Sequence, residues 1–60
     1  MDQKFFPTAG GAHKYAENSS RKHSANRYVI KCVGGYLVGS TSDLEKGETL
    51  EAIYFKGEKI

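Results

Sequence analysis

Few side chains in this sequence can do acid–base, nucleophilic or metal chemistry. The chain has two histidines, His13 and His23, and one cysteine, Cys32. Their spacing matches no zinc finger or zinc ribbon, so we predict neither a metal nor a cofactor. No pattern brings a histidine together with a serine and Asp43 as a hydrolytic site needs, and 60 residues provide little wall for a dry pocket. We therefore predict no catalytic residues and a protein that is not an enzyme.

The segment Gly34–Thr41 has a superficial likeness to a phosphate-binding loop. It has two glycines in the G-x-x-x-x-G spacing, followed by Ser40 and Thr41. The lysine that reaches the phosphates in such loops is replaced by Ser40, and the spacer is a hydrophobic strand. The glycines therefore indicate a turn, with Gly39 at a bulge or at a close approach of another backbone.

Basic and aromatic residues in the first half form the candidate binding site. Residues 1–31 hold six Lys/Arg and two acids, whereas residues 32–60 hold three Lys and five acids. Cations can bind phosphates and tyrosines can stack on bases, but arginine and tyrosine are also enriched at protein interfaces. We predict that these residues bind a partner, protein or nucleic acid: Lys14, Tyr15, Arg21, Lys22, His23, Arg27, Lys31 and Tyr36.

Two apolar runs around Gly34-Gly35 give the strongest structural signal. Residues 28–33 and 36–38 are rich in β-branched and aromatic side chains, and paired glycines supply the turn of a β-hairpin. Residues 49–56 have the same strand composition. We predict an α+β, mostly β fold: a three-stranded antiparallel meander of about residues 27–33, 36–41 and 49–56.

The chain is predicted to be one small domain, 1–60, in which a polar basic segment, 1–26, precedes the β-sheet core, 27–60. Within that segment residues 8–26 favour either a short, weak helix or a flexible stretch. Ser42 and Glu45 have the spacing of a capping box, so residues 42–47 predict one helical turn, with a tight turn as the alternative.

Both faces of the predicted sheet are apolar, and this predicts an interface. If Gly34-Gly35 is the hairpin loop, residue 33 pairs with Tyr36 and residue 32 with Leu37. The amino-terminal segment has too few large apolar residues to cover both faces, so the second face meets a partner or a second copy in a homodimer. We predict that this face contains Val29, Val33, Val38, Ile53 and Phe55. In that arrangement Val38→Glu yields a folded monomer.

The localisation and function follow from what the chain lacks. It has one cysteine and no long apolar stretch, so we predict a cytoplasmic protein with no membrane segment. In size and style it is similar to the accessory proteins of phages and other mobile elements, many of which inhibit or redirect a host macromolecule. The likeness implies a non-enzymatic regulator or inhibitor that binds another protein. The alternative is a small nucleic-acid-binding protein that uses the basic half and its tyrosines.

Overall fold

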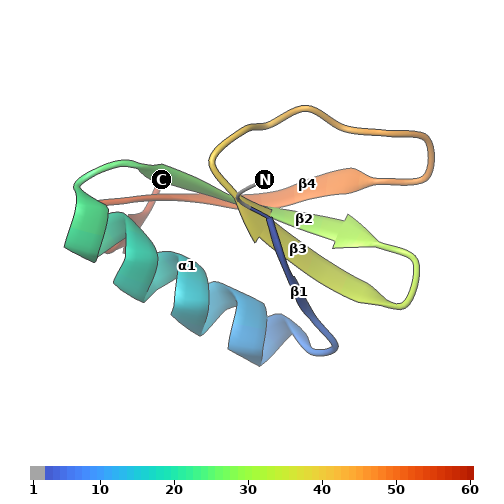
Figure 1. Cartoon of the computed structure of the whole chain (residues 1–60), viewed down its shortest axis with the longest axis horizontal. Helices are drawn as coiled ribbons and strands as arrows, with labels where there is room; N and C mark the ends of the chain where they lie inside the picture. The colour runs from blue at the N-terminus through green and yellow to red at the C-terminus, as the bar shows by residue number, and fades with distance from the viewer. Residues whose placement is uncertain (1–2) are drawn as a thin grey trace.

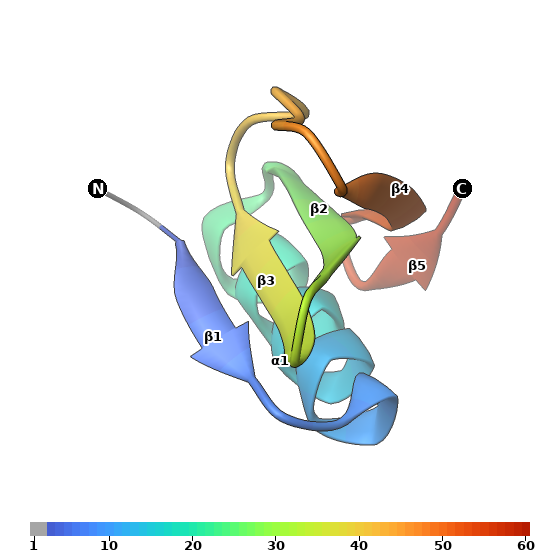
Figure 2. The same ribbon diagram turned by 90° about the vertical axis from the view of Figure 1, so that its right-hand side faces the viewer.

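A computed structural model describes residues 3–60 as a five-stranded antiparallel sheet with one helix on one face (Figures 1 and 2). The order of strands in the sheet is β1-β3-β2-β4-β5. The α+β class is as predicted, but the sheet has two more strands than the predicted three. The elements are β1 (Lys4–Phe6), α1 (Ala9–His23), β2 (Asn26–Cys32), β3 (Gly35–Gly39), β4 (Thr49–Phe55) and β5 (Glu58–Lys59).

The two unpredicted strands are short and lie at the edges of the sheet. Strand β1 pairs with β3, and β5 pairs with β4. Three residues before Pro7 are too few to show a strand periodicity, so β1 was not predicted. The β4–β5 hairpin has Lys56 at φ 52° and Gly57 at φ 84°, the positive values that a type I′ turn requires.

The predicted β2–β3 hairpin exists, but its predicted register is wrong. The turn residues are Val33 and Gly34, and Cys32 pairs with Gly35. Gly34 has φ 85°, whereas Gly35 belongs to β3. A Cβ on Gly35 would overlap the carbonyl oxygen of Phe6 and lie 2.6 Å from Cζ of Phe5. The second glycine is therefore needed because β1 crosses close to it, a contact that the hairpin sequence cannot reveal.

Within the amino-terminal segment, α1 is a helix of 15 residues. Of the two alternatives predicted for residues 8–26, the structure therefore shows the helix. The side chain of Thr8 caps the helix by accepting from the Gly11 N–H at 3.3 Å. Basic residues in the last turn complement the partial negative charge of that end. The buried stripe is Ala12, Ala16 and Ser20, so small side chains let the helix lie close to the sheet. No helix in the described range 3–60 is long and apolar enough to cross a membrane.

The loop between β3 and β4 has no helical turn, so the capping-box prediction for residues 42–47 is wrong and the alternative is correct. Glu48 N–H donates to Glu45 O at 3.0 Å, and Gly47 between them has φ 88°, which gives a tight turn. The Glu48 side chain also accepts from Glu45 N–H. Figures 1 and 2 both place this loop, residues 40–48, on the opposite side of the sheet from α1.

The main core lies between α1 and the sheet. Its sheet residues are Val29, Val38, Ala52 and Tyr54, with Phe6 and Tyr36 packed at its margin. Residues 3–26 thus contribute a strand and the covering helix to the same core as the rest of the sheet. Ile30 is also fully buried but lies outside this cluster, since its neighbour Val29 points to the helix.

Candidate functional site

The face of the sheet that points away from α1 is apolar and has no helix over it. Ile30 pairs with Leu37 and Leu50, and directly paired side chains in antiparallel strands point to the same face. On one side of this pair Phe5 of β1 pairs with Leu37, and on the other Tyr28 pairs with Ile53 of β4. We call this set the open sheet face: Phe5, Tyr28, Ile30, Cys32, Leu37, Leu50, Ile53 and Phe55.

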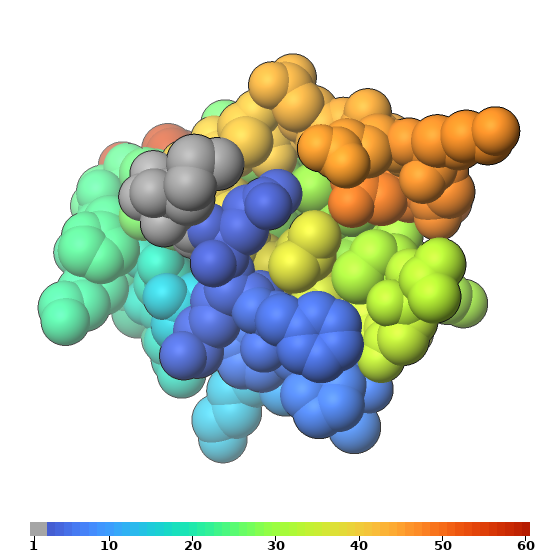
Figure 3. All heavy atoms as spheres, turned by 45° about the vertical axis from the view of Figure 1, so that its right-hand side comes forward, coloured from blue at the N-terminus to red at the C-terminus, as the bar shows by residue number. Residues whose placement is uncertain are grey.

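Solvent reaches much of this face. Phe5 is 51% exposed, Leu50 37% and Phe55 38%, whereas Ile30 at its centre is fully buried. The 40–48 loop overhangs part of the face, and its Leu44 is 46% exposed. Figure 3 shows the molecule from the β1 edge, with the loop (orange) above β3 (yellow) and β1 (blue). The face therefore has a buried centre and large apolar side chains that remain accessible around it.

Carboxylates border the open sheet face where the loop meets it. A cleft beside Leu37 is lined by Gln3, by residues of the loop and by three acids, Asp43, Glu45 and Glu48. These three side chains belong to the acidic half of the chain, which the loop brings to this side. The open sheet face thus has carboxylates on its loop side, whereas at Phe55 the ammonium of Lys56 lies 5.5 Å from the ring centroid.

A second, basic cleft lies between β1 and the carboxyl-terminal half of α1. It is lined by Gln3, Lys4, Tyr15, Ser19, His23, Arg27 and Val38. We call this set the basic cleft. The Arg27 guanidinium donates from Nε to Ser19 Oγ at 2.9 Å and from Nη1 to Asn26 O at 2.9 Å. Lys4 Nζ lies 5.9 Å from the ring centroids of both Phe6 and Tyr15.

The structure divides the eight predicted binding residues among several surfaces. Tyr15, His23 and Arg27 meet in the basic cleft. Lys14 and Lys22 are exposed on α1, on the side away from its buried stripe, and Lys31 is exposed on β2. Tyr36 packs at the margin of the helix-side core.

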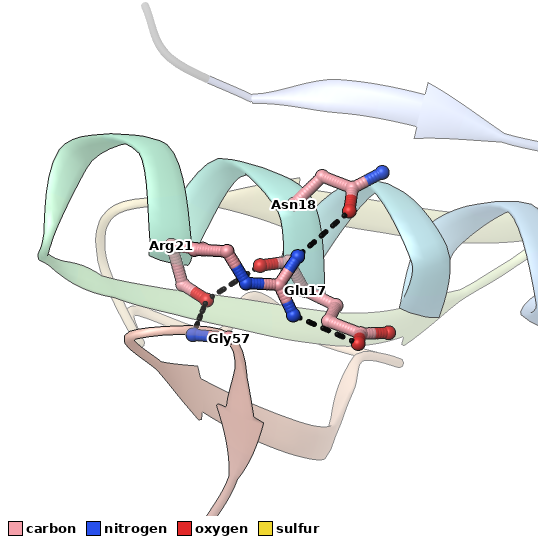
Figure 4. A network of polar contacts seen from close by, with 5 residues as sticks. Glu17, Asn18, Arg21 and Gly57 are labelled. Atoms are coloured by element: carbon pink, nitrogen blue, oxygen red, sulfur yellow. Dashed lines mark hydrogen bonds and ion pairs between the residues drawn. The ribbon is translucent and has the colours of Figure 1, made fainter.

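Arg21, the remaining predicted binding residue, lies on the other flank of α1. Its Nη2 is 3.2 Å from Glu17 Oε2, and Nη1 donates weakly to Asn18 at 3.4 Å (Figure 4). Its guanidinium covers Gly57, where a Cβ would lie 2.7 Å from Nε. Arg21 therefore packs against the β4–β5 turn and is separate from the basic cleft.

The five residues predicted to form one partner face do not share a face. Val29 and Val38 are fully buried under α1, and Val33 is 92% exposed in the hairpin turn. Ile53 and Phe55 belong to the open sheet face. The prediction failed because α1 covers Val29 and Val38, and because β4 pairs Ala52 with Val29, which puts Ile53 and Phe55 on the opposite face.

Sequence reasoning missed several residues of both surfaces. Lys4 and Gln3 in the basic cleft, and Phe5 on the open sheet face, are in place because β1 joins the sheet. The available signal was the pair Phe5-Phe6, in which adjacent strand residues point to opposite faces. Phe6 accordingly packs against Tyr15 of α1, with ring centroids 5.2 Å apart, while Phe5 is exposed.

His13 has a structural contact that ties α1 to β4. Its Nδ1 lies 2.7 Å from the hydroxyl oxygen of Tyr54. Burial, with a smaller contribution from Glu17, raises the pKa of Tyr54. Cys32 is half-buried on the open sheet face. Within residues 3–60 no three His, Cys, Asp or Glu side chains are grouped as a metal site.

The chain matches no model of a known protein family, no curated protein and no solved structure.

Proposed function

We propose that the protein is a non-enzymatic regulator or inhibitor that docks its open sheet face onto another protein. The observation that carries the proposal is the exposure of three large apolar side chains, Phe5, Leu50 and Phe55, on a sheet face without a helix. Burying apolar surface releases roughly 25 cal/mol per Å², and aromatic anchors are enriched at the centres of interfaces. A partner that covers this face would gain from all three side chains at once.

The charge at the border indicates the chemistry of the partner. Asp43, Glu45 and Glu48 stand beside the apolar surface on its loop side, so a complementary partner has an apolar centre with Lys or Arg on the side that meets this loop. A two-fold stack of two copies would bring two such acidic loops to one interface, where like charges repel. A foreign protein therefore fits the open sheet face better than a second copy does.

Site-specific photo-crosslinking in the cells that make the protein tests this function. A photoreactive phenylalanine analogue replaces Phe5 or Phe55 in separate variants. Asn18, exposed on the outer side of α1, is the matched control position. We expect one defined protein adduct from positions 5 and 55 and none from position 18. Leu50→Glu in the crosslinking variants should abolish the adduct while circular dichroism shows an intact fold.

Three outcomes would overturn the proposal. They are an absence of any adduct at positions 5 and 55, equal labelling from position 18, and an adduct that consists only of two copies of this chain. The last result would make the open sheet face a homodimer interface.

A further inference from the structure

The basic cleft brings two cations, Lys4 and Arg27, together with His23 and without a described counter-charge. Lys4 comes from β1, His23 from α1 and Arg27 from β2, and all three line the same cleft. None of the described residues that line it is an acid. Over residues 3–60 the one ion pair is that of Arg21 with Glu17, on the other flank of the helix. The fold thus gathers like charges at this position and leaves them open to a ligand.

The Arg27 side chain is held in place before any ligand arrives. Its bonds to Ser19 and to the Asn26 carbonyl use Nε and Nη1, so Nη2 still has donors to offer. A guanidinium presents its N–H groups as a planar fork that suits the oxygens of a phosphate. Because its orientation is already fixed, less side-chain entropy is lost when a ligand binds.

The other groups in the cleft suit the same ligand chemistry. Lys4 adds an ammonium, His23 adds ring nitrogens, and the amide of Gln3 adds a further donor. Tyr15 is 38% exposed and offers part of its ring beside them. The cleft has a volume of about 550 Å³, which lies within the usual range for sites that take a nucleotide-sized group.

We propose that the basic cleft binds a phosphate group, supplied either by a nucleic-acid strand or by a small phosphate anion. Lys4 and Arg27 neutralise the charge, while Ser19 holds the guanidinium and His23 donates a hydrogen bond. This site lies on the side of the sheet that α1 covers, opposite the open sheet face. It is therefore a second site, and a negative result for the protein interface would leave it untouched.

Fluorescence titration of a labelled, short thymidine strand measures the contacts directly. Two cationic contacts to a single strand should weaken binding about sevenfold when salt rises from about 50 to about 200 mM. Lys4→Gln or Arg27→Gln should each weaken binding and reduce that salt effect to about threefold, because one contact is lost. Lys46→Gln makes the same change in net charge at the exposed turn of the 40–48 loop and should match the wild type.

Two further probes identify the source of the phosphate and guard against misfolding. If pyrophosphate displaces the strand and shifts the amide signals of Lys4, Ser19 and Arg27, the ligand is a small phosphate anion. If affinity rises with strand length and pyrophosphate competes poorly, it is a nucleic acid. Arg27→Lys keeps the charge, so it should restore the salt effect, and Lys4→Gln removes no hydrogen bond that holds the fold.

The proposal fails on any of three results. The first is that neither the thymidine strand nor pyrophosphate binds. The second is that Lys46→Gln weakens binding as much as Lys4→Gln does. The third is that polyglutamate binds as tightly as the thymidine strand. The last result would assign the cleft to acidic proteins.

Discussion

Replacing Ser20 with alanine tests how the β4–β5 turn is attached to the helix. Ser20 is fully buried, and its hydroxyl donates to Glu17 O at 3.0 Å and accepts from the buried Gly57 N–H at 2.9 Å (Figure 4 shows the bond at Gly57). In the Ser20→Ala variant the Gly57 N–H has no partner, and leaving a buried donor unsatisfied costs about 2 kcal/mol. The higher helix propensity of alanine returns about 0.5 kcal/mol.

The net loss of about 1.5 kcal/mol is large for a chain of this size. A domain of 60 residues has a free energy of unfolding of about 3 to 9 kcal/mol. At about 4 to 8 °C per kcal/mol, Tm should fall by about 10 °C. Thermal unfolding followed by circular dichroism measures this, and hydrogen exchange at Gly57 should lose its protection.

Ser42→Ala is the matched control, since Ser42 is exposed in the 40–48 loop. Its unfolding free energy should change by no more than about 0.5 kcal/mol. If Ser20→Ala lowers Tm no further than Ser42→Ala does, or if Gly57 stays protected, the bond between α1 and the turn does not contribute as the structure indicates.

Three further predictions follow from the core and the turns. Val38→Glu buries a charge beneath α1, so circular dichroism should show an unfolded protein, whereas Val33→Glu in the exposed turn should stay folded. A folded, monomeric Val38→Glu variant would instead support the partner face predicted from the sequence. Gly35→Ala should lower the midpoint of urea unfolding because β1 must move to make room for the methyl group. Gly10→Ala, with open space at its Cβ, should raise the free energy of unfolding by about 0.5 to 1 kcal/mol. If Gly35→Ala were the more stable variant, β1 would not lie as close to Gly35 as the structure has it. Because the pKa of Tyr54 is raised in the fold, its contribution is fully present below pH of about 10 and is lost as pH rises further, so the alkaline loss of unfolding free energy should be smaller in Tyr54→Phe than in the wild type.

The three long strands were predictable because their signals are local. Strands β2, β3 and β4 lie within two residues of the predicted bounds, since runs of β-branched and aromatic residues favour extended backbone wherever they occur. The excess of basic residues in the first half was equally visible. It predicted one binding set of eight residues, and the structure places three of them, Tyr15, His23 and Arg27, in one cleft.

The edge strands and the register needed contacts between distant segments. Strand β1 has three residues, and only its pairing with β3 makes it a strand. That same pairing is the reason for Gly35, so the hairpin turn moved to Val33 and Gly34. The local sequence fits a turn at Gly34-Gly35 and a turn at Val33-Gly34 equally well. The neighbouring strand β1 decides between them.

The sequence by itself determined that a small α+β protein would have an apolar sheet and a basic amino-terminal half. It also required that one face of the sheet be covered and the other left open, because only one segment was available to cover them. The tertiary structure decided which face is which. Ala12, Ala16 and Ser20 are small enough for α1 to lie directly on Val29 and Val38. Strand alternation fixes the two sets of side chains, and packing against the helix decides which set is buried. Phe5, Leu50 and Phe55 therefore lie exposed on the open sheet face.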